Sequence, residues 1–139
     1  MDLPKKVVDK MMSGDAFSQW LGIEVLEISI GFCKLKMKVR KEMTNGFDIA
    51  HGGIAYSIAD SCLAFAANTD GVQSISIETS ISHTKKVMSG DTLIAQAKEI
   101  NKGGKTALYY ITITNQDNIE IAHFKGTVFR TAKEWFPNK

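Results

Sequence analysis

Residues 54–67 carry apolar side chains on almost every side of a helix, with one carboxylate, Asp60, among them. The apolar positions are Ile54, Ala55, Ile58, Ala59, Cys62, Leu63, Phe65 and Ala66. A helix that is apolar on most sides is buried inside a protein rather than laid on its surface. Gly52-Gly53 precedes this stretch and Asp70-Gly71 ends it, which predicts one central helix over residues 52–69.

The remaining chain must supply the elements that enclose this helix. Residues 4–21 have a helical pattern that breaks near Ser13-Gly14-Asp15, with Ser13 or Asp15 as the cap of the second piece. Strand patterns, separated by turn signals, cover residues 23–30, 32–40, 74–84, 91–101, 106–115 and 119–131. The last three favour an antiparallel meander. The order predicts an α+β fold in which one antiparallel sheet curls around one helix.

Length and charge limit the class of protein. The 139 residues suit one domain, and we treat residues 1–139 as that domain, with residues 1–21 as its N-terminal helical segment. The formal charge of +2, without a block of like charges, gives no reason to expect nucleic acid as a partner. The first residues do not resemble a signal peptide, and residues 54–67 are too short for a membrane span.

Metal and redox chemistry are not expected. Cys33 and Cys62 do not form a metal-binding or redox spacing, which predicts a reduced, cytoplasmic setting. His83 and His123 lie on separate predicted strands and make no ligand spacing, so we expect no metal.

Residues 32–40 alternate between apolar and basic side chains, with Lys34, Lys36, Lys38 and Arg40 on one face. This predicts a half-buried strand with a cationic outer face. Such lysines commonly keep sheet edges from aggregating, and we favour this interpretation over a row of anion-binding residues.

The glycine pair Gly52-Gly53 is a candidate site for activating an electrophile. The first turn of a helix has N–H donors without intrahelical partners and the positive end of the macrodipole. Glycine allows a carbonyl to approach without meeting a Cβ atom. Such a fixed donor stabilises a developing oxyanion by roughly 3–4 kcal/mol in studied hydrolases. A tight turn without a ligand is the alternative.

Asp60 is the candidate base or nucleophile, because an unpaired buried charge is costly. It follows Gly53 by seven residues, which places both on one face but about 10 Å apart along the axis. One helix therefore cannot bring Asp60 to a carbonyl held at its own N-terminus. Two antiparallel helices across a two-fold axis could pair Gly53 of one subunit with Asp60 of the other, which predicts an interfacial site in a dimer. A buried Asp that caps a polar network is the alternative.

Three further polar residues are candidates for the site. Asn45-Gly46 is a strong turn dipeptide, but the Asn45 amide could also orient a water or a carbonyl. His51 could act as a base, although its place beside the glycines suits a shaping role through a backbone hydrogen bond. Ser76 alternates with its apolar neighbours and is expected to share a face with Glu78 and Ser80. No base or elbow that would activate this serine is visible.

The spacing of these residues resembles a known family. The motif is Asn45-Gly46-x4-His51-Gly52-Gly53-x6-Asp60, followed by Gly90-Asp91 and Phe124-Lys125-Gly126-Thr127. Over residues 15–131 the chain is similar to the hotdog-fold acyl-CoA thioesterases of the phenylacetate-degradation (PaaI-type) branch, which includes human thioesterase superfamily member two. The resemblance implies a helix wrapped by an antiparallel sheet of five to six strands. It also implies a homodimer with a continuous sheet, usually doubled to a homotetramer.

The resemblance also implies an activity and roles. The expected reaction is hydrolysis of an aryl- or medium/long-chain acyl-CoA to free acid and CoA, with no cofactor, since CoA is part of the substrate. Gly53 or its neighbour Gly52 polarises the thioester carbonyl. Asp60, reaching across the dimer, acts as the nucleophile or as the base for a water.

The other implied roles concern positioning. Asn45 and Ser76 place the water or the carbonyl, and His51 helps to build the site. Many relatives carry an Arg-Pro pair where this chain has Lys85-Lys86. Lysine can still bind a phosphate, though without bidentate geometry.

The substrate contacts are less specific. Candidates for the nucleotide end are Lys85, Lys86, Lys102 and Lys105, each of which could equally be an exposed turn lysine. Candidate walls of the acyl pocket are Phe47, Phe65, Met43 and Leu63, all equally suited to the core.

Two other functions remain open from the sequence. One is acyl-CoA binding without catalysis, and the other is action on carrier-protein thioesters by a hotdog enzyme. Hotdog dehydratases depend on a catalytic His, whereas Asp60 occupies the helix position here.

Overall fold

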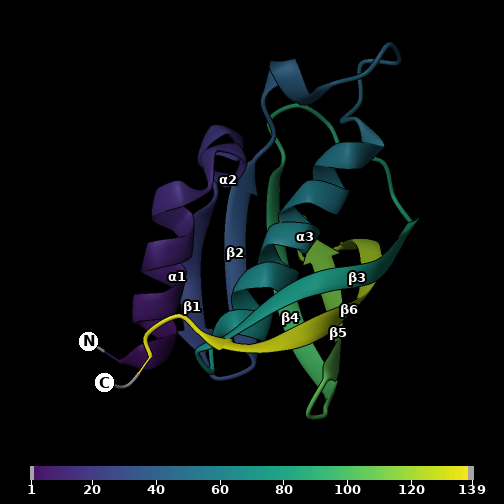
Figure 1. Cartoon of the computed structure of the whole chain (residues 1–139). Helices are drawn as coiled ribbons and strands as arrows, with labels where there is room; N and C mark the ends of the chain where they lie inside the picture. The colour runs from purple at the N-terminus through teal and green to yellow at the C-terminus, as the bar shows by residue number, and fades with distance from the viewer. Residues whose placement is uncertain (1, 138–139) are drawn as a thin grey trace.

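The computed structural model describes residues 2–137 (Figure 1). The helices are α1 (Leu3–Gly14), α2 (Ala16–Leu21), α3 (Gly52–Asn68) and a short 3-10 helix η1 (Lys41–Met43). The strands are β1 (Glu24–Ser29), β2 (Phe32–Lys38), β3 (Val72–His83), β4 (Thr92–Lys102), β5 (Thr106–Thr114) and β6 (Glu120–Glu134). In the part of the chain that the structure describes, no helix is both long and apolar enough to cross a membrane.

The six strands form one antiparallel sheet in the order β1-β2-β4-β5-β6-β3. Helix α3 lies against one face of this sheet, while α1 and α2 lie beside the β1–β2 end (Figure 1). Strand β3 follows α3 in sequence but pairs with β6, which leaves β3 at the far edge. The predicted antiparallel sheet around one central helix is confirmed, including the meander β4-β5-β6.

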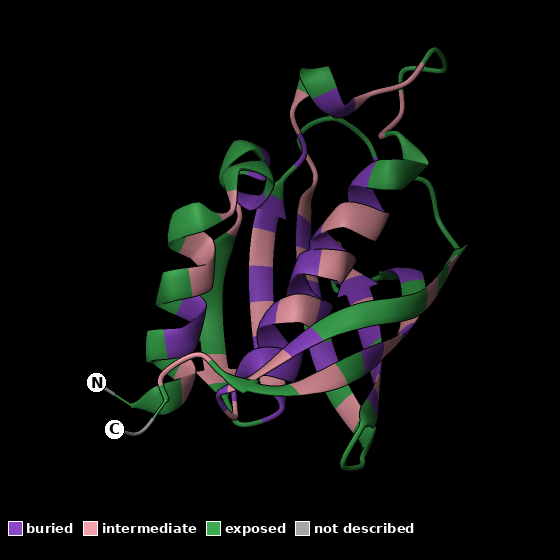
Figure 2. Ribbon diagram, in the orientation of Figure 1, coloured by how far each residue is buried: buried purple, intermediate pink, exposed green. Residues whose placement is uncertain are grey.

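The core lies between α3 and the inner face of the sheet, where Figure 2 shows buried residues on both layers. Strand β2 shows the predicted alternation, with Cys33, Leu35 and Met37 buried and the lysines on the outer face. Phe65 is fully buried in this core, with 0% of its surface exposed. It lines neither of the two cavities at α3 described below, so its place in the wall of a substrate pocket stays a prediction.

The break between α1 and α2 is set by a cap. The Asp15 carboxylate accepts hydrogen bonds from the Ser18 backbone N–H (2.9 Å) and the Ser18 hydroxyl (2.6 Å). The same hydroxyl lies 2.8 Å from the Ser61 hydroxyl on α3, and both serines are buried. A side-chain oxygen at this position satisfies N–H groups that the helix leaves unpaired. Asp15 thus joins the helix break to the middle of α3.

Gly126 allows α3 to approach β6 closely. A Cβ atom at this position would lie 2.5 Å from Leu63 Cδ2 and 3.2 Å from Phe124 Cε1. Leu63 is buried on α3, so an added atom at Gly126 would force this side chain or the backbone beside it to shift. The glycine therefore sets the spacing between the helix and the strand.

We expect Gly126→Ala to lower the free energy of unfolding by about 1–3 kcal/mol, because extra atoms in a packed core force side chains and backbone to shift. The matched control is Gly104→Ala, since a Cβ atom there meets nothing within 4 Å. Urea denaturation of both variants measures the difference. Equal stability of the two would contradict the close packing.

Candidate active site

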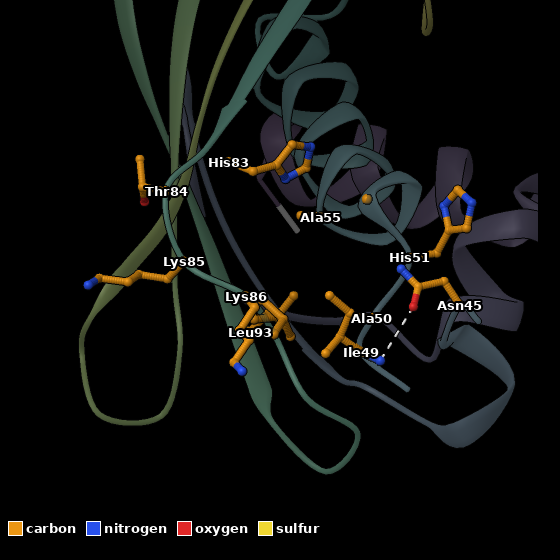
Figure 3. Close-up of a pocket in the computed structure, with 12 residues that line it drawn as sticks. Asn45, Ile49, Ala50, His51, Ala55, His83, Thr84, Lys85, Lys86 and Leu93 are labelled. Atoms are coloured by element: carbon orange, nitrogen blue, oxygen red, sulfur yellow. Dashed lines mark hydrogen bonds between the residues drawn. The ribbon is translucent and has the colours of Figure 1, made fainter. Parts of the chain in front are cut away.

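One end of α3 opens into a cavity of about 360 Å³. Its lining includes Asn45, His51, Gly52, His83, Lys85 and Lys86, which we call the glycine half-site. Figure 3 shows Asn45 and His51 across the cavity from Lys85 and Lys86. Two segments far apart in sequence therefore meet here: residues 45–55, which form the loop before α3 and its start, and residues 83–87 at the end of β3 and just after it.

Asn45 holds the loop before α3 with its own side chain. Its amide oxygen accepts a hydrogen bond from the Phe47 N–H at 2.9 Å and from the Ile49 N–H at 3.5 Å, the second drawn in Figure 3. The backbone N–H of Asn45 donates to the Ile49 carbonyl at 2.8 Å. The amide nitrogen has no hydrogen-bond partner among residues 2–137, which leaves it available to the cavity.

His51 caps α3 and decides which glycine N–H is free. The ring Nδ1 accepts a hydrogen bond from the Gly53 N–H at 3.0 Å, which is the shaping contact expected from the sequence. The N–H of Gly52 has no partner among the described residues. Of the two glycines, Gly52 is therefore the one whose amide can bind a substrate oxygen.

His83 is a site residue that the sequence analysis missed. Strand β3 ends beside the start of α3, and the His83 ring lies 3.5 Å from where a Cβ atom on Gly52 would be. No short spacing to another histidine marks it, because the contact depends on how β3 packs against α3. An imidazole therefore stands beside the free Gly52 amide.

A second cavity, of about 370 Å³, lies further along α3 and contains both Asp60 and Ser76. We call these two residues the aspartate half-site. Asp60 has no hydrogen-bond or salt-bridge partner in the described part of the chain, so it is not the cap of a polar network. Burial raises the pKa of Asp60, and the nearby negative charge of Asp15 raises it further. Once ionised, such a carboxylate is a stronger base than an exposed one.

The position of Ser76 corrects the sequence analysis. Ser76 pairs with Val128 and Glu78 pairs with Thr127, so Ile77 is an extra residue in a β-bulge. Because Val128 is buried, Ser76 faces α3, whereas Glu78 lies on the outer face. The predicted shared face of Ser76, Glu78 and Ser80 is therefore wrong, and the bulge is what turns Ser76 toward Asp60.

The two half-sites do not meet within one chain. Their cavities share no lining residue. Gly52 and Asp60 are eight residues apart on a continuous helix, which separates them by about 12 Å along the axis. A single subunit thus offers an oxyanion donor and a carboxylate in separate places.

The residues predicted to contact the substrate lie in different parts of the structure. Lys85 and Lys86 line the glycine half-site, and their contact with the nucleotide end of CoA stays a prediction. Lys102 instead forms a salt bridge with Asp70, with 3.3 Å between Nζ and Oδ2. Phe47 is 86% exposed at the tip of the loop before α3.

The other candidate walls lie deeper. Met43 is buried in the core, whereas Leu63 lines the cavity of the aspartate half-site. Among residues 2–137 no group of three or more His, Cys, Asp or Glu residues could hold a metal ion.

Comparison with known proteins places this arrangement in a family. The model of the thioesterase superfamily matches residues 47–122, which contain His51, Gly52, Asp60 and Ser76. The chain belongs to the thioesterase superfamily. The acyl-coenzyme A thioesterase PaaI of Escherichia coli is 34% identical over 120 residues, which cover 86% of each chain. A "Putative esterase" of Archaeoglobus fulgidus is 39% identical over 133 residues, covering 96% of this chain and 86% of the relative.

Solved structures agree. The E. coli PaaI protein from the phenylacetic acid degradation operon superposes with a TM-score of 0.92 at 31% identity, covering 94% of this chain and 95% of that one. A Streptococcus mutans protein bound to acetyl-CoA gives a TM-score of 0.78 at 25% identity, covering 81% and 90%. The predicted hotdog fold and the resemblance to the PaaI-type thioesterases are confirmed.

We expect Asp60→Asn to unfold at the same temperature as the wild type or a higher one. The folded-state pKa of Asp60 is raised above its ordinary value of 3.8, so ionised Asp60 costs stability at neutral pH. The advantage of the variant should shrink as the pH falls through the folded-state pKa.

Asp70→Asn is the control, and we expect it to lower the unfolding temperature at neutral pH, the opposite of Asp60→Asn. Burial favours the neutral form of Asp70, but hydrogen bonds from the Val72 N–H and the Arg130 guanidinium outweigh it and lower the pKa of Asp70. The ionised Asp70 carboxylate therefore contributes to the free energy of unfolding above pH 3.8, and this contribution is lost as the pH falls through the lowered pKa. Thermal unfolding between pH 3 and 7 measures both variants; a lower melting temperature for Asp60→Asn at pH 7 would show that the carboxylate is structural.

Proposed function

We propose that this chain is an acyl-CoA thioesterase, acting as a homodimer whose two active sites each combine the glycine half-site of one subunit with the aspartate half-site of the other. The observation that carries the proposal is that the free Gly52 amide and the unpaired Asp60 carboxylate lie on one helix but face two separate cavities. E. coli PaaI is named as an acyl-CoA thioesterase, and the S. mutans relative binds acetyl-CoA, which supports the substrate class.

The dimer is supported by the edge of the sheet. Among residues 2–137, strand β3 pairs only with β6, so its other edge is unpaired along much of this 12-residue strand, although the Ser74 N–H and carbonyl bond the Asn68 side chain. Ile75 and Ile77 on this strand are 60% and 58% exposed. A long, apolar, unpaired edge strand is a site for pairing with another chain. Antiparallel pairing of β3 with its copy across a two-fold axis extends the sheet and brings the two copies of α3 near each other. Pairing of two such dimers would give the tetramer that the family resemblance implies.

The reaction follows from the chemistry of the two half-sites. The Gly52 N–H, at the positive end of the α3 dipole, donates a hydrogen bond to the thioester oxygen. Asp60 of the other subunit either adds to the thioester carbon or removes a proton from a water that adds to it. The C–S bond then breaks, the electron pair leaves with the sulfur, and CoA departs as a thiolate that takes up a proton. Where Asp60 itself adds, the acyl group remains on Asp60 as an anhydride, and a water then cleaves it to give the free acid and restore the carboxylate. A thiolate is a good leaving group, so one carboxylate and one oxyanion donor suffice.

The remaining polar groups position the reactants. The free Asn45 amide nitrogen and the Ser76 hydroxyl place the water or the carbonyl in this proposal, and His83 stands beside the oxyanion donor. Lys85 and Lys86 face the phosphates of CoA as point charges.

Asp60→Asn tests the proposal. We expect the wild type to release thiol from at least one ester in a panel of aryl- and fatty acyl-CoAs. The variant should lower kcat by about 10²- to 10⁴-fold, the range that a general base contributes. The matched control is Asp117→Asn, an exposed turn residue that lines neither cavity, which should keep full activity. A folded Asp60→Asn protein with unchanged kcat would contradict the mechanism, and no turnover by the wild type would favour a binding role.

A further inference from the structure

The cavity that contains Asp60 extends beyond the reacting groups. Its other walls are mostly apolar and come from four elements and the segment after β6. They are Met11 on α1, Leu63 and Ala64 on α3, Ser74 and Ile75 on β3, Val128 on β6 and Trp135 just after β6. Apart from Ser74 and Ser76, the residues that line the cavity with this carboxylate are apolar. That is the arrangement expected where an apolar group must lie beside a reacting carboxylate.

Trp135 is held in place at both its backbone and its side chain. Its indole N–H donates to Asn68 Oδ1 at 2.8 Å, and its backbone N–H donates to the Gly71 carbonyl at 2.8 Å. Asn68 is buried and is itself fixed, because its amide nitrogen donates to the Ala64 carbonyl at 2.7 Å. The indole is therefore a rigid wall rather than a side chain free to swing away.

Phe136, the residue after Trp135, lies close to α1, which also supplies Met11. The Phe136 ring lies under the ammonium groups of Lys6 and Lys10, at 4.5 and 5.1 Å from its centroid. Figure 1 shows this C-terminal segment running back to α1. Met11 and Trp135 both lie outside residues 47–122, which the superfamily model matches. Two terminal segments of the chain thus line the cavity beside residues of the family core.

We propose that the acyl group of the substrate occupies this cavity and that Trp135 and Met11 are specificity-determining residues that set an upper limit on acyl length. The inference rests on the proposed thioesterase function and adds a substrate class to it. The cavity volume of about 370 Å³ is near the lower end of small-molecule sites. A compact, flat acyl group fits against the indole face, since aromatic rings prefer such offset contacts. A long straight chain must displace the Trp135 side chain and break the hydrogen bond from its indole N–H to Asn68.

The kinetic test compares phenylacetyl-CoA with dodecanoyl-CoA. The wild type should have the higher kcat/KM for phenylacetyl-CoA. Trp135→Ala and Met11→Ala should each shift the ratio of the two kcat/KM values toward dodecanoyl-CoA by roughly tenfold or more, the scale at which a pocket discriminates by size. Trp135→Phe retains a ring and should retain the preference.

The control is Phe136→Ala, which loosens the same segment but does not line the cavity. It should leave the ratio within about twofold of the wild type, because the pocket size that sets discrimination is unchanged. A folded Trp135→Ala protein with the wild-type ratio would overturn the proposal. A wild type that prefers dodecanoyl-CoA would overturn it as well.

Fluorescence tests the same assignment without turnover. The chain has two tryptophans, so in a Trp20→Phe background the emission reports Trp135 alone. Phenacyl-CoA, a thioether that cannot be hydrolysed, should change this emission, whereas CoA alone should not. An equal response to both, or to neither, would place the acyl group elsewhere. A response to phenacyl-CoA from a protein that hydrolyses no CoA ester would support the acyl cavity while contradicting the thioesterase function.

Discussion

The burial of helix α3 is the constraint on which the rest of the structure depends. Apolar side chains cover almost its whole circumference, so the sheet has to enclose it, and Gly126 lets β6 approach closely. Asp60 is the one ionisable group with a charge at neutral pH on this helix, and burial together with Asp15 makes its ionisation unfavourable. A protein keeps such a carboxylate at a cost in stability, which is typical of a functional group.

The same helix explains why the site requires two chains. The free Gly52 amide and Asp60 lie on one rigid rod, about 12 Å apart along its axis, and no loop within the subunit can bring them together. The unpaired edge of β3 offers the surface on which a second copy can add. The fold therefore does two things: it separates the Gly52 donor from the Asp60 carboxylate along α3, and it leaves the edge of β3 exposed.

The sequence predicts what depends on local periodicity, and it fails where distant segments meet. The limits of α3, the alternation in β2 and the Asp15 cap all follow from neighbouring residues. The direction of Ser76 depends on a bulge in the β3–β6 pairing, and the place of His83 depends on β3 packing beside α3. Periodicity also cannot tell which apolar residue of a buried helix faces a cavity. Leu63 lines the cavity that contains Asp60, whereas Phe65 lines neither cavity at this helix.

The most direct test of the composite site is to produce two inactive variants together. Asp60→Asn removes the carboxylate, and Gly52→Pro removes the amide donor while suiting the first position of a helix. In a mixed dimer one site lacks both groups and the other is intact, so random pairing should restore roughly a quarter of the wild-type thioesterase activity. Mixed dimers that form but remain as inactive as each variant alone would contradict a site shared between subunits.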